Sequence, residues 1–406
     1  MAIATLFDAD FNGCVELFFL RHILSFFKMY LVITLSSKFT IKQIFHDHWD
    51  DFLNNYPNVR SVVIDEVEKS MECGNPAKGY ALYFCEHCFK FKHVPFRCKS
   101  RFCNTCGTSY QMDRSFSISS KLINCKHRHI VFTIPEELRI FFRKDRDLLN
   151  ILFKASAQVM LDWFFAQNKS QNFIPGIVSS LHTFGRDLKW NPHIHMLVTE
   201  GGSGNFSVWR HVKHFPFVML RKKWQTTLLF YMEEALGKSQ FRNLKNKLYS
   251  AHPEGFYVHA PSSDFNSPNT VANYITRYIG RPAMAQSRII HYDGSFVTFW
   301  YQRHEDNKRI EETLHAHDFI KRLIIHIPQK HFHMLRYYGL YARNHKFQDK
   351  FIRLLSSSQV KARRFFKRWA FRIEQSFGFD PTKCSCGNYM NFLYIYIPSS
   401  IASSPP

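Results

Sequence analysis

The sequence is short of acidic residues. It has 32 Asp and Glu against 54 Lys and Arg, which gives its 406 residues a formal net charge of +22. This imbalance argues against an acidic-to-neutral surface and favours a polyanionic partner, of which nucleic acid is the usual one. A basic surface that merely keeps the protein soluble accounts less well for the 42 Phe, 18 Tyr and 7 Trp, because exposed aromatic rings can stack on unpaired bases.

The sequence also lacks an uninterrupted apolar run and a convincing secretory signal. The most apolar segment, residues 15–35, is broken by Glu16, Arg21, His22 and Lys28, which argues against a membrane-spanning helix. We therefore expect a cytoplasmic protein with no membrane partner. Residues 1–40 are interpreted as a separate extension, either an amphipathic helix or an upstream addition to a chain that starts near Met29.

Neither an internal repeat nor a disulfide framework is evident. Six of the ten cysteines fall between Cys73 and Cys106, and this clustering is typical of a metal site in a reducing cytosol. With 45% hydrophobic residues, the chain is long enough for two or three domains around a well-buried core.

Strand and helix patterns are mixed along the chain. Strand patterns, rich in β-branched and aromatic residues, cover residues 129–135, 176–185, 193–200 and 296–301. Helical patterns cover residues 41–70, 136–167, 215–248 and a basic tail from about residue 360. This order predicts an α+β fold built on an antiparallel sheet.

A pair of Cys-x2-Cys motifs is the clearest local signal. Cys85 and Cys88 are followed, after fourteen intervening residues, by Cys103 and Cys106. Four thiolates saturate a tetrahedral zinc ion and leave no position for a substrate. The spacing therefore predicts one structural zinc site on these four cysteines.

Several other residues are further candidates near that site. Cys73 or Cys98 can replace one of the four ligands, and His87 and His93 are also possible donors. The pair at residues 384 and 386 has a spacing too short for an ordinary knuckle, so we expect it to stay outside metal binding.

His193 and His195 form a second candidate metal site. Alternate residues of a strand point to one face, so both imidazoles would face a site while Ile194 enters the core. With one more N or O ligand they would bind Mg²⁺ or Mn²⁺, which grips a phosphate and orients it for in-line attack. Four other His-x-His pairs occur, at 46/48, 127/129, 315/317 and 331/333. Only the 193/195 pair has an apolar middle residue inside an expected strand, since the segment around 331/333 has a helical pattern.

Tyr274 and Tyr278 are candidate nucleophiles. They lie one helical turn apart, and a phenol needs a metal or an arginine such as Arg277 to attack at neutral pH. Tyr337 and Tyr341 share the spacing, and aromatic packing on a helix explains either pair equally well. Spacing alone therefore leaves the nucleophile open.

Five segments decide among these possibilities by resemblance. They are WNPHIHMLVTEGG from residue 190, YITRYIGRP from 274, HIVFTIPEELR from 129, CKSRFCNTCG from 98 and IPQKHFHMLRYYGLYA from 327. As an ordered set, over about residues 41–390, they resemble the two-tyrosine HUH transposases of rolling-circle insertion sequences, the IS-ninety-one type.

The resemblance implies a fold and a domain order. It implies a Rep-like HUH nuclease core with a central antiparallel sheet and flanking helices. A zinc-binding domain at residues 41–112 would precede the nuclease domain at 113–310. A basic helical region at 311–406, with a disordered end, would follow. Within this region, residues 361–372 form either a helix that contacts the DNA backbone or one packed on the core.

The resemblance also implies roles for residues. His193 and His195 match the metal-binding histidines, and Tyr274 and Tyr278 match the paired nucleophiles, with Arg277 offsetting charge. The motif does not fix the third metal ligand, for which His182 is our first choice and Asp187 the second.

The function implied is that of a transposase. It would nick and rejoin single-stranded DNA at insertion-sequence ends through a 5′-phosphotyrosyl intermediate. A plasmid replication initiator or relaxase would use the same chemistry. A protein of another class, a non-catalytic zinc-finger DNA-binding protein, would explain the charge and the cysteines but not the ordered histidine and tyrosine segments.

Overall fold

A computed structural model of the chain describes residues 39–119, 121–212, 214–259, 283–303, 305–343, 370–371, 373–374 and 378–398. The predicted extension at residues 1–40 therefore falls almost wholly outside the described residues, and so does nearly all of the basic segment 361–372. Within the described chain, no helix is both long and apolar enough to cross a membrane.

A six-stranded antiparallel sheet forms the centre of the molecule, with the order β11-β4-β5-β3-β7 and a short β6 beside β5. Its strands are β3 (His127–Phe132), β4 (Ile174–Phe184), β5 (Trp190–Ser203), β6 (Arg210–His211), β7 (Val258–His259) and β11 (Leu335–Gly339). The expected α+β fold with an antiparallel sheet is confirmed. The three strands predicted from residues 129, 176 and 193 correspond to β3, β4 and β5.

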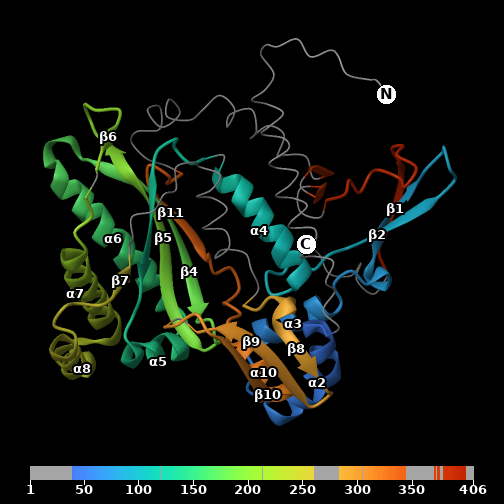
Figure 1. Ribbon diagram of the computed structural model, residues 1–406, viewed down its shortest axis with the longest axis horizontal. Helices are drawn as coiled ribbons and strands as arrows, with labels where there is room; N and C mark the ends of the chain where they lie inside the picture. The colour runs from blue at the N-terminus through green and yellow to red at the C-terminus, as the bar shows by residue number, and fades with distance from the viewer. Residues whose placement is uncertain are drawn as a thin grey trace, which may run out of the picture.

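Four helices cover one face of this sheet (Figure 1). They are α5 (Glu136–Lys144), α6 (Leu149–Gln167), α7 (Phe217–Leu236) and α8 (Lys238–Ala251). Ile194, Met196 and Val198 of β5 point into the large apolar core between the sheet and these helices. Because side chains alternate along a strand, His193 and His195 are left on the opposite face.

The opposite face is only partly covered. The end of helix α4 (Asn104–Ser119) lies against it, where Ile118 packs with Val178 of β4 and Leu197 of β5. Along both strands, the histidines lie beyond this contact, toward the β4–β5 turn. The covering layer therefore leaves room for a site at that end of the sheet.

A second body joins segments from distant parts of the sequence (Figure 1). It consists of α2 (Ile41–Asn55), α3 (Ser61–Met71), β8 (Ile289–Tyr292), β9 (Phe296–Gln302), β10 (Arg309–His315) and α10 (Ala316–Ile324). Phe45 and Trp49 of α2 share a core with Phe319 of α10. The predicted boundary at residue 310 falls inside β10, and the N-terminal helices pack on later segments.

A three-stranded ribbon stands away from both bodies (Figure 1). Strands β1 (Tyr80–Phe84) and β2 (Phe91–Pro95) form a hairpin, and β12 (Asn391–Tyr396) pairs with β1 in the order β12-β1-β2. The register places Tyr80 opposite Tyr396 and Phe84 opposite Asn391.

The prediction of a helical region at 311–406 was wrong for much of its described part. Residues 335–339, expected to be helical, form β11 and pair with β4, and β12 completes the ribbon. Tyr337 and Tyr338 point to opposite faces of the central sheet, and each meets an apolar layer. Aromatic residues at successive positions hide the two-residue period of such a strand.

Candidate metal centre and active site

Three histidines meet on the open face of the central sheet. His182 of β4 is paired in register with His193 of β5, and His195 lies one step further along β5. Their ligand nitrogens all lie within 4.8 Å of one another, and the Nε2 atoms of His193 and His195 are 3.0 Å apart. We call this set the His cluster.

The hydrogen bonds of His193 direct the lone pair of its Nε2 toward His195. Its Nδ1 lies 2.7 Å from the carbonyl oxygen of Asn191, which can only accept, so Nδ1 carries the proton in the neutral ring. Burial lowers the pKa of His193 to about 4 and that of His195 well below its usual value. Both rings are therefore neutral at pH 7, the form that binds metal.

Ser180 contributes a buried hydroxyl on the same face of the sheet as the His cluster. Ser180 is paired in register with His195, so its side chain faces the same side of the sheet. Its Oγ is buried and has no hydrogen-bond partner among the described residues. The nitrogens of the His cluster and this hydroxyl suit a hydrated divalent ion, so the residues present fit the metal that the sequence predicts.

His129 is a functional candidate that the sequence did not single out. Its Nε2 lies 2.9 Å from Nδ1 of His195, and the two rings stack with centroids 5.1 Å apart. Burial lowers the pKa of His129 to about 4, so its ring is neutral and its Nε2 can accept a hydrogen bond from the Nδ1–H of His195. Such an outer partner fixes the tautomer and orientation of a ligating histidine.

The alternative third ligand, Asp187, does not join the cluster. Its carboxylate accepts a hydrogen bond from the backbone N–H of Lys189 and lies 3.6 Å from the Lys189 ammonium. It closes the turn between β4 and β5. Of the two candidates, the structure brings only His182 to the other histidines.

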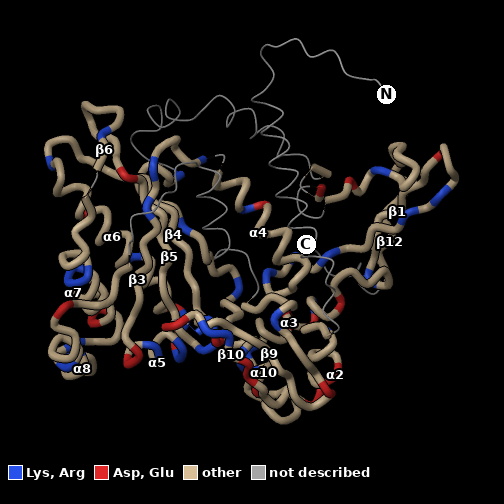
Figure 2. Tube along the Cα trace, in the orientation of Figure 1, with Lys and Arg blue, Asp and Glu red and all other residues tan. Residues whose placement is uncertain are grey.

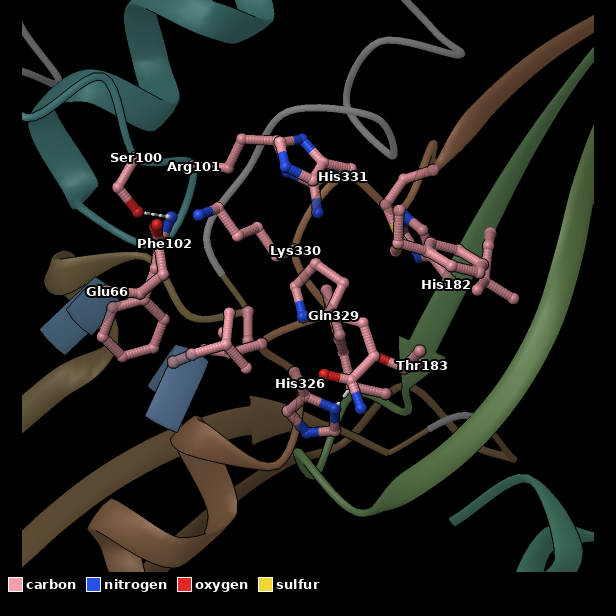
Figure 3. Close-up of a pocket in the computed structure, with 18 of the residues that line it drawn as sticks. Glu66, Ser100, Arg101, Phe102, His182, Thr183, His326, Gln329, Lys330 and His331 are labelled. Atoms are coloured by element: carbon pink, nitrogen blue, oxygen red, sulfur yellow. Dashed lines mark hydrogen bonds between the residues drawn. The ribbon is translucent and has the colours of Figure 1, made fainter. Parts of the chain in front are cut away.

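A cavity of about 300 Å³ opens beside His182. It lies between the end of β4, residues 98–102 and residues 326–334, as Figure 3 shows. Arg101, Lys330 and His331 border the same space as His182 (Figure 3). Cationic side chains beside a candidate metal site can bind the phosphates that flank a reacting one.

Basic residues are not confined to this cavity. Lys and Arg positions are spread over both the ribbon and the two bodies (Figure 2). Arg101 also reaches over the ring of Tyr110 of α4, as does Arg114. The charge excess in the sequence therefore belongs to the whole surface and not to one module.

Tyr274, Tyr278 and Arg277 lie outside the described residues. The alternative pair, Tyr337 and Tyr341, is described. Tyr337 pairs with Val178, four residues along β4 from His182, which corresponds to about 13 Å. Burial raises the pKa of Tyr337 to about 12.

Tyr341 has a structural role. Its hydroxyl lies 2.6 Å from Nε2 of His127 and accepts a hydrogen bond from the backbone N–H of Ile123. Burial raises its pKa well above the usual value. Its ring lies against Gly176, where an added Cβ would come within 2.6 Å of it. Neither tyrosine of this pair is placed or ionised for attack at the His cluster.

The four cysteines predicted to share one zinc site are separated in the structure. Cys103 and Cys106 gather with Cys73 and Cys98, a set that we call the base cluster, with all sulfurs within 4.8 Å of one another. The Cys73–Cys106 and Cys98–Cys106 sulfur distances are 3.5 and 3.6 Å.

The hairpin explains the separation. Cys85 and Cys88 lie at the turn between β1 and β2, and each strand has five residues, or about 17 Å of length. They gather instead with Cys384 and Cys386, a set that we call the ribbon cluster. The 384/386 pair, which we expected to stay outside metal binding, therefore lies within a set of four cysteines that could hold a metal ion. His87 and His93 belong to neither set.

Two regions of the chain match known families of proteins. Residues 176–348 match a family model described as "Putative transposase", and this region contains most of β4, all of β5 and the whole His cluster. Residues 44–134 match one described as "Transposase zinc-binding domain", which contains the whole base cluster.

Two relatives match over most of their length. The chain is 32% identical over 302 residues to the "Transposase for insertion sequence element IS801" of Pseudomonas savastanoi pv. phaseolicola, covering 70% of this chain and 71% of the relative. It is 26% identical over 294 residues to the "Putative transposase y4qJ" of Sinorhizobium fredii (strain NBRC 101917 / NGR234), covering 68% and 73%. No solved structure matches.

Proposed function

The chain belongs to the IS91-type family of transposases with an N-terminal zinc-binding domain, and from this premise we propose that it nicks and rejoins single-stranded DNA at insertion-sequence ends. The observation that carries the proposal is the His cluster, three imidazoles on the open face of the sheet beside a basic cavity. The substrate follows from the relatives, one of which is described as the transposase of an insertion sequence element.

His182, His193 and His195 would hold the catalytic ion. A divalent ion such as Mg²⁺ or Mn²⁺ in this position would polarise a scissile phosphate and offset its charge. The chain's own contribution is orientation, because the Asn191 carbonyl and His129 direct the two ligating rings of β5.

The basic cavity would hold the strand next to the scissile phosphate. Lys99, Arg101 and Lys330 line it together with His182, so a phosphate bound by these cations would lie next to the His cluster. At about 300 Å³ the cavity falls within the size range of ligand pockets, which supports the binding of a phosphate-bearing group there.

The nucleophile would be Tyr274 or Tyr278, an assignment that rests on the resemblance of their segment. The phenolate oxygen attacks phosphorus, the bond from phosphorus to the 3′ oxygen breaks, and that oxygen takes up a proton. The products are a 5′-phosphotyrosyl bond and a free 3′-OH. Because one phosphodiester replaces another, the reverse attack by a 3′-OH rejoins DNA without ATP. The second tyrosine would process the other end, and Arg277 would offset the developing charge.

The position of the adduct tests this chemistry. Full-length protein is incubated with single-stranded element ends and Mn²⁺, with the label at either the 5′ or the 3′ end, and resolved on a denaturing gel. The 3′-labelled strand should shift to a covalent protein band, while the 5′-labelled strand should give a shorter free fragment. An adduct on the 5′-labelled strand, or nicking without any adduct, would contradict the proposed intermediate.

Variants identify the nucleophile. Combined Tyr274→Phe and Tyr278→Phe substitutions should abolish the adduct, and the single substitutions should show which tyrosine cleaves each end. Tyr337→Phe is the matched control, because its phenol lies about 13 Å along the sheet from His182 and should leave the adduct unchanged.

A further inference from the structure

The ribbon cluster has the dimensions of a tetrahedral thiolate site. The sulfurs of Cys85 and Cys386 are 3.5 Å apart, those of Cys88 and Cys384 are 3.4 Å apart, and all four lie within 4.8 Å of one another. These separations exceed the roughly 2.05 Å of a disulfide bond. Four sulfurs at about 2.3 Å from a zinc ion would be about 3.8 Å from one another, close to the separations observed.

Two similar turns supply the four thiols. In the first, the backbone N–H of Cys85 donates to the carbonyl of Lys90, and Phe89 has φ +58°. In the second, the N–H of Cys384 donates to the carbonyl of Asn388, and Gly387 has φ +89°. Each turn places its second cysteine just before a residue in the left-handed region, so the two form facing knuckles.

A hydrogen-bond donor also faces one of the sulfurs. The side-chain amide of Asn388 lies 3.6 Å from the sulfur of Cys386 and can donate to it. N–H groups directed at sulfur favour the thiolate, which is the form that binds metal. The donor and the sulfur are two residues apart in the second turn, so this hydrogen bond favours the thiolate form of Cys386.

The ribbon has too small a core to hold itself together. Its buried cluster consists of Tyr83, Cys85, Cys384 and Met390. All six residues of β12 are exposed, including Phe392, whose side chain is 53% exposed. A three-stranded sheet with so little buried apolar surface needs a further source of stability, and small domains commonly obtain it from a structural metal.

We propose that Cys85, Cys88, Cys384 and Cys386 bind a second structural zinc ion, which fastens β12 to the β1–β2 hairpin. The base cluster would hold the first ion. Neither matched family region includes residues 384 and 386, since the two regions end at residues 134 and 348. The site therefore joins a part of the chain outside those regions to the zinc-binding domain.

Zinc content of the full-length protein tests the proposal. It is measured in a variant carrying His193→Ala and His195→Ala, so that the His cluster contributes no metal. This background should hold two zinc ions per chain, one for each cysteine cluster. Adding Cys384→Ser and Cys386→Ser should reduce the content to one.

Matched variants locate the ion that is lost. Cys73→Ser with Cys98→Ser should also leave one zinc ion, whereas Cys125→Ser, which changes a cysteine of neither cluster, should leave two. The proposal is overturned if the 384/386 variant keeps two zinc ions. It is also overturned if the background with His193→Ala and His195→Ala holds only one zinc ion and the 73/98 variant holds none.

A measurement on the protein with His193→Ala and His195→Ala, in which all the cysteines are intact, does not depend on how the cysteine variants fold. Zinc-edge X-ray absorption should show only sulfur neighbours, four per zinc, at about 2.3 Å for both ions. Nitrogen or oxygen neighbours making up about an eighth or more of the average coordination, which is one such ligand at one of the two sites, would rule out two tetrathiolate sites. Backbone amides of residues 80–84 should exchange faster with solvent after chelation, because β12 would no longer be held to β1.

Discussion

The His cluster and the ribbon cluster are supported in opposite ways. Behind the His cluster lies the large core between the central sheet and α5–α8, which contains fully buried residues such as Phe132, Phe153 and Ile194. Among the described residues, the ribbon cluster has beside it two buried side chains that are not cysteines, Tyr83 and Met390.

This difference in packing indicates which role a metal ion can have at each cluster. Where packing already holds the scaffold, three ligands are enough and a coordination position remains for a phosphate. Where packing is absent, four thiolates close the site and the binding free energy of the ion becomes folding free energy. With both proposed sites occupied, one chain would use metal for chemistry in its best-packed region and for stability in its least-packed one.

The largest expected difference between the two regions is in catalysis, which should depend on the His cluster. His193→Ala combined with His195→Ala should reduce single-strand nicking roughly a thousandfold or more, because the site would no longer hold the ion that polarises the phosphate. The thermal midpoint should move by only a few degrees, since the core is untouched. Nicking is measured with labelled strands, and His211→Ala, a change at an exposed histidine, is the control. Normal nicking by the double variant would end the assignment of a catalytic metal to these residues.

The next effect concerns the source of stability. Phe132 is fully buried on the helix-covered face of the central sheet and packs on Trp224 with ring centroids 5.1 Å apart. Phe132→Ala should lower the free energy of unfolding by about 3–5 kcal/mol while leaving the zinc content unchanged. Phe392→Ala, in the exposed strand β12, should change it by less than about 0.5 kcal/mol. Equal losses in denaturant titrations would remove the contrast between the regions.

A smaller effect comes from pH. The Nε2–H of His326 donates to the carbonyl of Leu188, its Nδ1 lies 3.0 Å from Thr183 Oγ1, and burial lowers its pKa to about 4. In the unfolded chain its pKa is near 6.5, so the unfolded state binds more protons between pH 6.5 and 4. The stability from the neutral ring is therefore complete above pH 6.5 and is lost as pH falls toward 4, by up to about 3 kcal/mol.

Comparison of variants isolates this contribution. His326→Gln should unfold with a weaker dependence on pH between 6.5 and 4.5 than the parent, measured by denaturant titration at several pH values. The exposed His211→Gln should follow the parent. A variant curve parallel to that of the parent would show that His326 titrates normally in the folded protein.

The smallest effect is on metal affinity at the His cluster. His129→Ala removes the ring that meets Nδ1 of His195, and loss of such an outer partner typically weakens metal binding about 10–100-fold. His127→Ala removes an equally buried ring from the same strand and face, but one that contacts Tyr341. Mn²⁺ titration should therefore show a shift for His129→Ala and little for His127→Ala. Equal shifts would indicate a general disturbance of β3.

The His cluster was predictable because its pattern is local. A two-residue period places His193 and His195 on one face, and the neighbouring strand pattern was enough to choose His182. His129 was not predictable in this way, because its contact with His195 depends on β3 pairing with β5 so that Val131 lies opposite His195. Such a register is set by long-range packing and not by any motif.

The cysteine grouping failed for a related reason. Two Cys-x2-Cys motifs fourteen residues apart resemble one site in sequence, but the hairpin β1–β2 carries the first motif away from the second. The true partners of Cys85 and Cys88 are about 300 residues away in the chain. The boundary drawn at residue 310 had the same weakness. Strands β9 and β10 pair with each other, and together with α10 they pack on the N-terminal helices, which no local pattern indicates.

The pairing of β1 with β12 also imposes an order in time. Cys85 and Cys386 are 301 residues apart, and at about 5–20 residues per second a ribosome needs on the order of 15–60 s to make that stretch. Throughout this interval the first knuckle has two thiols without their partners, and β1 has an open edge. A product that ends after residue 203 but before residue 384 would contain His193 and His195 but would lack β12. The three-stranded ribbon can therefore form only after translation has passed residue 396.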